Sequence, residues 1–263
     1  MNTHKPYFMV APLLIVSLAL SGCAAFAPAA TNTPPAPTRT PRPTVRPTST
    51  AKPTKTPLPT PTPNLTATQQ ANDFIAQVQQ YYDAKYISTL DGHYTLLGDA
   101  KHSWAQGEYY QWWNTGSLPT DFVLNSDIAW NSSSLSSNTV SGCGFVFRLQ
   151  NGGSSQSSKR TYYVIFVSLA GYVYYWSDTG NNTKFMGSAY YGPGKQIGAV
   201  AFGLIVESNQ FRVLINGKSI KTFSGYSANF NQGGLAYTVI SGTNKGTGTN
   251  CEFNNTRLWT MIH

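Results

Sequence analysis

Apolar and polar residues alternate one by one along most of the chain after Tyr86, in short runs that end at glycine, asparagine or serine. A period of two is typical of β-strands that bury one face. A hairpin turn is predicted at Asn216-Gly217, because this dipeptide readily takes the positive φ angles of a type I′ turn. Short strands without helices between them predict an all-β fold, a sandwich or jelly roll. The expected strands are 93–97, 108–114, 121–130, 143–149, 161–168, 172–177, 199–206, 210–215, 218–223, 234–241 and 250–261.

The pattern is different between residues 65 and 87, where apolar side chains recur at steps of three and four residues. Thr66 and Gln69 resemble a capping box at the start of a helix. We therefore expect one helix that either packs on a β-sandwich domain spanning 88–263 or leads into it, with self-association of the helix as the alternative. The residues of its apolar stripe are Ala71, Phe74, Ile75, Val78, Tyr81 and Tyr82.

Two cysteines lie in the β-rich region, Cys143 in an early strand and Cys251 in the last one. Gly142 and Gly144 flank Cys143, and such glycines suit a position where another backbone comes near. We predict a disulfide between Cys143 and Cys251, with two buried thiols as the alternative. Closing a loop of roughly a hundred residues would stabilise the fold by ~4–5 kcal/mol in the chain-entropy model.

The first residues have the order of a secretory signal: a basic residue at Lys5, an apolar run over 8–20, and then Leu20-Ser21-Gly22-Cys23. The apolar run is too short for a membrane-spanning helix. The tetrapeptide resembles the bacterial lipobox, which implies cleavage after residue 22 and acylation of Cys23. The protein is then exported and lipid-anchored on the outer face of the bacterial cell membrane. An ordinary signal peptide and an uncleaved anchor are the alternatives.

Threonine and proline dominate the segment 23–64. Proline fixes φ and removes backbone donors, so we expect an extended, disordered stalk that holds the domain on the order of 100 Å from the bilayer. Plain disorder without a spacer role is the alternative.

All ten acidic residues follow this segment, together with twelve of the eighteen basic ones. The domain is therefore close to neutral, and we expect no nucleic-acid partner. We also expect the protein to be a monomer.

Several strands together resemble a known superfamily. They are the run from Asp121 to Trp130, Gly144 to Arg148, Tyr162 to Phe166, Gly171 to Tyr174, and Phe211 to Gly217. This succession is similar to the concanavalin A-like lectin/glucanase superfamily, in the style of laminin G-like and 3-keto-disaccharide hydrolase-like domains. The resemblance covers about 88–263 and implies a jelly-roll sandwich. Members range from sugar-binding modules to glycosidases and adhesion domains, so the fold alone does not determine the function.

Catalytic residues are not evident in the domain. Glycosidases need two carboxylates ~5–9.5 Å apart, and the candidates Glu108, Asp127, Glu207 and Glu252 share no motif. The Glu-x-Asp-x-x-Glu signature of sandwich glucanases is absent from the sequence. We therefore predict no catalytic residues, and an enzyme is the less favoured interpretation.

Metal ligands are equally sparse. The histidines of the domain, His93, His102 and His263, stand in no metal-ligand spacing. The loop 177–183 offers oxygen atoms that could suit calcium, but it lacks several carboxylates, and an ordinary turn is the favoured interpretation. We expect no metal site and no cofactor.

Aromatic side chains are numerous on a chain with few charges, more than one core comfortably holds. Flat rings stack on the apolar faces of sugars, while neighbouring polar groups bind the hydroxyls. Tyr172, Tyr174 and Trp176 alternate in one strand and so share one face. Arg148 follows the inward-pointing Phe145 and Phe147 and is expected on the outer face of its sheet, although an ordinary surface arginine is the alternative. The predicted ligand-binding residues are Arg148, Trp112, Trp113, Tyr172, Tyr174 and Trp176.

These observations predict a cell-surface lipoprotein whose sandwich is a non-catalytic binding module for carbohydrate or another extracellular polymer. Two other interpretations stay open. One is a structural or adhesion domain that contacts protein or the cell envelope. The other is a glycoside hydrolase-like enzyme.

Overall fold

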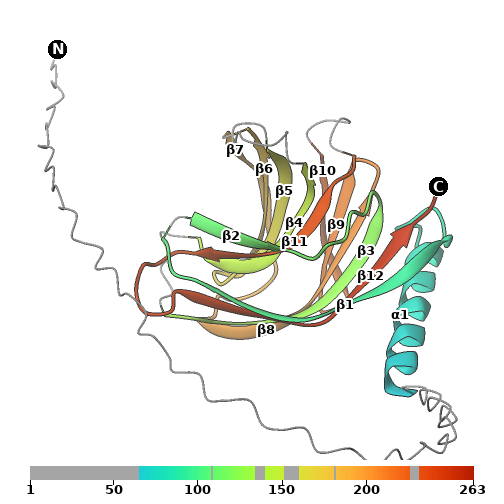
Figure 1. Cartoon of the computed structure of the whole chain (residues 1–263), viewed down its shortest axis with the longest axis horizontal. Coiled ribbons are helices and arrows are strands. Elements are labelled where there is room, and N and C mark those ends of the chain that lie inside the picture. Colours follow the sequence, from blue (N-terminus) through green and yellow to red (C-terminus); the bar gives the residue numbers. More distant parts are fainter. Residues whose placement is uncertain (1–64, 108, 134–139, 151–159, 181, 226–230) are drawn as a thin grey trace, which may run out of the picture. The chain divides into compact units, whose positions relative to one another are not determined.

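The computed structural model describes residues 65–107, 109–133, 140–150, 160–180, 182–225 and 231–263 (Figure 1). They form one helix followed by strands that pair only with antiparallel neighbours. The predicted signal peptide, the lipidation site Cys23 and the stalk lie outside the described residues and stay predictions.

The elements are α1 (Leu65–Asp83), β1 (Gly92–Trp104), β2 (Tyr109–Asn114), β3 (Phe122–Ser132), β4 (Gly142–Gln150), β5 (Thr161–Ser168), β6 (Tyr172–Thr179), β7 (Thr183–Tyr190), β8 (Ile197–Glu207), β9 (Gln210–Ile215), β10 (Lys218–Ser224), β11 (Gly234–Ser241) and β12 (Thr249–Met261). They build two six-stranded sheets. Sheet A has the order β1-β12-β3-β8-β9-β10, and sheet B has the order β2-β11-β4-β5-β6-β7. The predicted sandwich is confirmed, as is the hairpin turn, where Asn216 and Gly217 both have positive φ.

Strand β7 is the element that the sequence pattern missed. Between β6 and β7 the pairing slips: Tyr175 faces Gly187, whereas Trp176 faces Phe185, so Met186 is the extra residue of a bulge. An extra residue moves all later side chains to the opposite face. The alternation that identifies a strand is therefore broken in the middle of β7.

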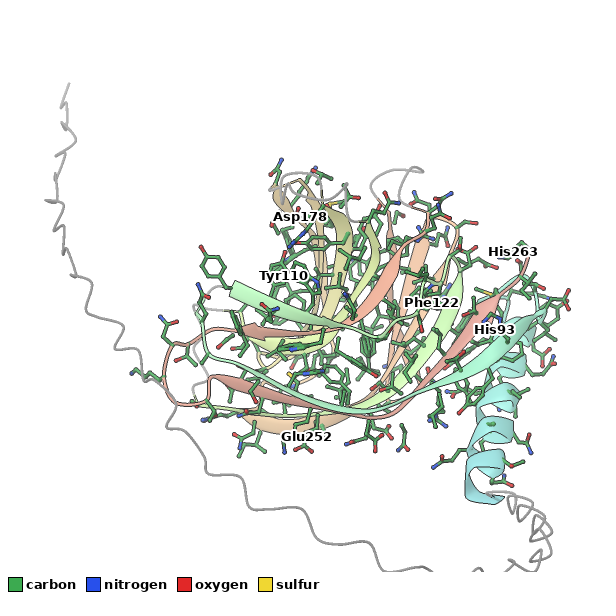
Figure 2. All side chains as sticks on the ribbon, in the orientation of Figure 1. His93, Tyr110, Phe122, Asp178, Glu252 and His263 are labelled. Atoms are coloured by element: carbon green, nitrogen blue, oxygen red, sulfur yellow. A yellow bond between two sulfur atoms is a disulfide. The ribbon has the colours of Figure 1, made fainter. Side chains whose placement is uncertain are left out.

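The core lies between the two sheets and is rich in aromatic side chains (Figure 2). It includes Phe122, Phe145, Phe147, Tyr163, Phe202, Phe211 and Phe253. The predicted disulfide is confirmed within this core: Cys143 of β4 and Cys251 of β12 are bonded, with their Cα atoms 5.8 Å apart. It is a covalent link between sheet B and sheet A.

The glycines beside Cys143 allow β5 to approach closely. A Cβ atom at Gly144 would lie 2.2 Å from the carbonyl oxygen of Ile165, and one at Gly142 would lie equally close to that of Val167. Any larger residue would push β5 away from β4.

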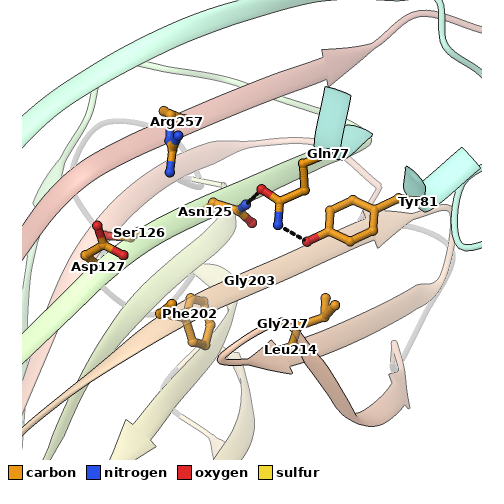
Figure 3. Close-up of a pocket in the computed structure, with 11 residues that line it drawn as sticks. Gln77, Tyr81, Asn125, Ser126, Asp127, Phe202, Gly203, Leu214, Gly217 and Arg257 are labelled. Carbon is orange, nitrogen blue, oxygen red and sulfur yellow. Dashed lines mark hydrogen bonds between the residues drawn. The ribbon is translucent and has the colours of Figure 1, made fainter. Parts of the chain in front are cut away.

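Helix α1 packs on the outer face of sheet A, which is one of the roles expected for it. Phe74, Val78 and Tyr81 of the helix form a buried apolar cluster with residues of that face. The partners from the sheet are Val123, Ile205, Leu214 and Met261. A polar bridge accompanies the cluster: Asn125 of β3 donates to Gln77, and Gln77 donates to the Tyr81 hydroxyl at 2.8 Å (Figure 3).

The disulfide predicts a large change in stability. Replacing Cys143 and Cys251 by alanine removes a link between residues 108 positions apart. We expect the free energy of unfolding in urea to fall by about 4 kcal/mol, because the unfolded chain regains the freedom that the loop closure removed. The wild-type protein in reducing agent is the control and should unfold at the same denaturant concentration as the variant. An unchanged midpoint would contradict the stabilising role.

Candidate ligand-binding face

Aromatic side chains gather on the outer face of sheet B, the face away from the core. In β6, Tyr172, Tyr174 and Trp176 point outward, while Val173 and Tyr175 between them are buried in the core. Trp112 of β2 packs against the same outer cluster as Tyr174 and Trp176. The sheet thus brings together four of the predicted ligand-binding residues: Trp112, Tyr172, Tyr174 and Trp176.

The rings make contacts across the whole sheet. Tyr110 of β2 lies 6.3 Å, centroid to centroid, from Tyr162 of β5 and from Trp176 of β6. Strands β11 and β4 lie between β2 and β5 in the sheet order. A flat sheet would hold β2 and β5 about 14 Å apart, so sheet B must curl toward this face. Figure 1 shows the curl, because β5–β7 stand steeply whereas β2 runs across the view.

Polar groups lie among these rings. The hydroxyls of Tyr110 and Tyr162 are hydrogen-bonded to each other. Asp178 is buried on the same face and accepts a 2.7 Å bond from the Thr183 hydroxyl (Figure 2). Burial, as the largest cause, raises the pKa of both tyrosines. Their hydroxyls therefore stay protonated at neutral pH. The Arg160 guanidinium lies 5.6 Å from the centre of the Trp112 ring.

The exposed part of this face lies on β6 and the edge strand β7. Tyr172 is 38% exposed, Phe185 57% and Tyr190 61%. The ring centroids of Tyr172 and Tyr190 are 5.3 Å apart. The Tyr174 ring lies 6.0 Å from that of Tyr172 and 6.1 Å from that of Phe185, centroid to centroid. We call these four residues, Tyr172, Tyr174, Phe185 and Tyr190, the aromatic strip. Neighbouring exposed rings of this kind mark a surface for an apolar contact.

Phe185 and Tyr190 were missed by the sequence reasoning, since they belong to the strand that it did not find. One signal could have indicated this strand: Phe185 and Tyr190 are two aromatic residues that lie between two turn-like segments.

Trp113 does not belong to the outer face. It follows Trp112 directly and therefore points to the opposite side of β2, where it packs against the core. Its ring is stacked on His102, with the centroids 4.1 Å apart. Burial lowers the pKa of His102, so this imidazole is neutral at neutral pH.

The prediction that Arg148 lies on the outer face is wrong. A bulge follows Phe147, where the pairing of β4 slips against both β5 and β11, and Arg148 has a φ of 53°. Because of the extra residue, the Arg148 side chain points inward like that of Phe147 before it. Arg148 is only 1% exposed.

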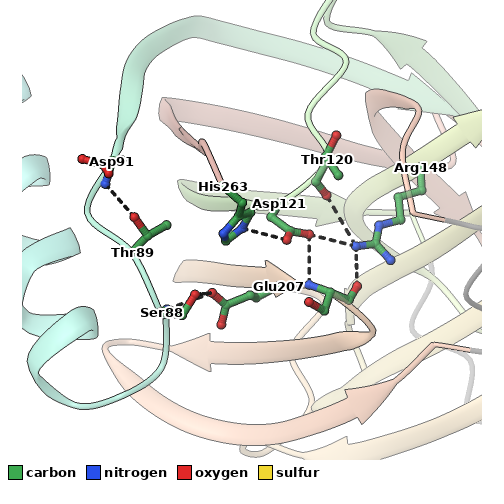
Figure 4. Close-up of polar contacts among 9 residues, drawn as sticks. Ser88, Thr89, Asp91, Thr120, Asp121, Arg148, Glu207 and His263 are labelled. Carbon is green, nitrogen blue, oxygen red and sulfur yellow. Dashed lines mark hydrogen bonds and ion pairs between the residues drawn. The ribbon is translucent and has the colours of Figure 1, made fainter.

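Arg148 is instead the centre of a buried polar network (Figure 4). Its guanidinium donates to Asp121 at 3.2 Å and to the carbonyl of Ser208, and it lies 5.2 Å from the ring of Phe211. Asp121 also accepts from the Ser208 amide at 3.0 Å and pairs with His263 at 3.0 Å. Burial lowers the pKa of Arg148, and the Asp121 carboxylate opposes that shift.

None of the described candidate carboxylates lies on the aromatic face. Asp127 and Glu252 project from the outer face of sheet A, where Asn255 donates to Asp127 and Lys101 pairs with Glu252. Glu207 accepts bonds from the amide and hydroxyl of Ser88. Glu108 lies outside the described residues. In the described part of the chain, no group of three or more histidine, cysteine, aspartate or glutamate residues could hold a metal ion.

No protein-family model and no curated protein matches the sequence. A carbohydrate-binding module from Bacillus subtilis is similar in structure, with 13% identity over 62% of this chain and 94% of that one and a TM-score of 0.44. A Bacillus subtilis protein of unknown function with a galectin-like fold has 9% identity over 65% and 89%, with a TM-score of 0.43. The exoplasmic/lumenal domain of VIP36 in its Ca2+/Man-bound form has 8% identity over 66% and 82%, with a TM-score of 0.46.

These likenesses concern the fold alone. The class that the structure itself defines is an all-β sandwich of two six-stranded antiparallel sheets. Among the residues that the structure describes, no helix is both long enough and apolar enough to cross a bilayer.

The network around Arg148 predicts that a substitution of this residue strongly lowers the stability of the fold and removes no contact to a ligand. Arg148→Met should lower the free energy of unfolding by about 3–5 kcal/mol, because it leaves the Asp121 carboxylate buried without its cation. Lys101→Met is the matched control. It breaks the exposed pair with Glu252 and should cost less than about 1 kcal/mol. Equal losses in urea denaturation would contradict this account.

Proposed function

We propose that this chain is a non-catalytic module that binds carbohydrate through the aromatic strip. The observation that carries the proposal is the continuous, exposed set of rings on β6 and β7. A folded domain normally turns such large apolar surfaces inward, so their exposure indicates a surface that meets a ligand.

The chemistry of the face suits sugars. The apolar C–H faces of sugar rings stack on tyrosine and phenylalanine, and tyrosine hydroxyls at the ring edges can bond the sugar hydroxyls. Farther along the same face, the Tyr110 and Tyr162 hydroxyls bond each other and Asp178 is buried, so these groups support the face from below. The domain is nearly neutral, so the proposed ligand is a neutral polysaccharide and its binding depends little on salt.

The presentation of the module belongs to the same proposal. Cys23 would carry the lipid anchor at the outer face of the membrane, and the threonine- and proline-rich segment 24–64 would hold the domain away from it. A polymer outside the cell would then be within reach of the aromatic strip.

The anchor predicts a simple change in location. The full chain, expressed in a bacterium that processes lipoproteins, should incorporate labelled fatty acid and sediment with the membranes. Cys23→Ser should lose the label and appear in the soluble exported fraction, because the acylated sulfur is gone. The same label and distribution in both proteins would contradict lipidation at Cys23.

The aromatic strip predicts a specific loss of binding. Replacing Tyr172 and Tyr190 by alanine should weaken retention on insoluble polysaccharides at least tenfold, since a loss of about 1.4 kcal/mol suffices for that factor. Tyr109→Ala is the matched control, because Tyr109 is 60% exposed but points to the opposite side of β2. The test is a pull-down with a panel of polysaccharides, and unchanged unfolding curves would show that all variants are folded.

Two results would contradict the proposal. One is retention that the double variant leaves unchanged. The other is a wild-type protein that binds no sugar, which would favour a structural or adhesion domain.

A further inference from the structure

Three adjoining depressions lie along the outer face of β3 in sheet A, on the opposite sheet from the aromatic strip. The first, of about 110 Å³, lies beside α1 and includes Asn125 and Asp127. The second, of about 360 Å³, shares Asp127 and Ala201 with the first. The third, of about 380 Å³, shares Ala129 with the second and extends to Asn131. We call these depressions together the β3 track.

The track is long and has one closed end. Alternate residues of a strand share a face, so Asn125 and Asn131 are about 20 Å apart. Gln77 and Tyr81 of α1 form the wall at the Asn125 end (Figure 3). Beyond them the apolar cluster under the helix covers sheet A. A chain molecule could lie along the track but could not continue past α1.

The closed end carries an unused hydrogen-bond acceptor. Asn125 is 8% exposed, and its side-chain oxygen Oδ1 has no donor among the protein atoms. A buried acceptor without a donor destabilises the fold, and a hydrogen bond from a ligand hydroxyl would remove that cost. The oxygen points toward Gly203 across the cavity (Figure 3), where a Cβ atom would come within 3.2 Å of it. Glycine at this position therefore keeps the space open.

The other groups at the closed end can bond to hydroxyls as well. The Tyr81 hydroxyl accepts its bond from Gln77 and so keeps its own proton for a ligand. Burial raises the pKa of Tyr81, so that proton is held at neutral pH. The Arg257 guanidinium and the Asp127 carboxylate line the same cavity.

The remaining track is open, with an apolar floor, polar borders and balanced charge. Its floor is made of small side chains, which include Ala129, Ala199 and Ala201. Amide side chains border it, contributed by Asn131, Asn216, Asn250 and Asn254. The anions Asp127 and Glu252 are matched by the cations Arg257 and Lys101. Such a lining suits a neutral ligand with many hydroxyls better than an ion.

We infer that the β3 track binds the end of a neutral polyhydroxylated chain, with its terminal hydroxyls at Asn125 and the following units over Ala201 and Ala129. The first depression holds only a few water-sized groups, so it fits the tip of such a chain. This inference takes its ligand class from the proposed function, but it concerns a separate site on the other sheet.

Ala201→Leu tests the track without removing a hydrogen bond. Ala201 is exposed, and its hydrogen bonds with Asn216 are made by its backbone, so the substitution keeps them. The longer side chain should block the passage between the first two depressions and weaken the binding of linear oligosaccharides at least tenfold in calorimetry. Ala76→Leu, on the exposed side of α1, is the matched control and should bind like the wild type.

A second measurement tests the recognition of the chain end. Linear oligosaccharides should bind, whereas cyclic ones of the same sugar, which have no end, should not compete with them. The inference is overturned if Ala201→Leu binds like the wild type, if the cyclic compounds compete equally, or if the cavity at Asn125 holds only water in a crystal soaked with the linear ligand.

The two proposals fail in different ways. Loss of binding in Ala201→Leu alone supports the track and contradicts the aromatic strip. Loss in the Tyr172 and Tyr190 double variant alone supports the strip and overturns the track. A wild-type protein that binds no oligosaccharide overturns both.

Discussion

Each strand of the sandwich divides its side chains between two faces, because successive residues of an extended chain point to opposite sides. The inner faces of both sheets fill one core, whose aromatic side chains and central disulfide hold the sheets together. That core has a limited volume, and half of every strand must face outward. The outer faces therefore have their own chemistry, and it differs between the sheets. Sheet B presents aromatic rings, whereas the part of sheet A beside α1 presents amides, carboxylates and small side chains.

The same constraint explains what the sequence could predict. The fold class, the hairpin at Asn216-Gly217, the disulfide and the shared face of Tyr172, Tyr174 and Trp176 follow from local alternation and from the cysteine positions. Trp113 was misplaced although alternation alone puts it on the opposite side of β2 from Trp112. The two other errors occur at bulges. One extra residue hid β7, and another turned Arg148 from the expected outer face into the core. A bulge depends on the partner strand, so a single strand's pattern does not reveal it.

The β3 track could not be predicted for a related reason. Asn125, Asp127, Ala129 and Asn131 are unremarkable polar and small residues within one strand. They become a track only because β12 and β8 flank β3, and because α1 covers the neighbouring part of the sheet. The pairing of β3 with β12 joins residues more than a hundred positions apart. Contacts at this separation are a property of the folded chain, not of any local window.

The two faces also differ in what they require of a ligand. They lie on opposite sides of a sandwich whose sheets pack about 10 Å apart, with side chains adding to that distance. A short oligosaccharide cannot reach from the aromatic strip to the β3 track, so its affinity reports one site at a time. A long polymer can engage both, and the second contact is then intramolecular and gains from a high effective concentration. Binding to soluble fragments therefore separates the sites, whereas retention on an insoluble polymer combines them. A variant that loses one face should still be retained less well than the wild type, because the gain from the intramolecular second contact is lost.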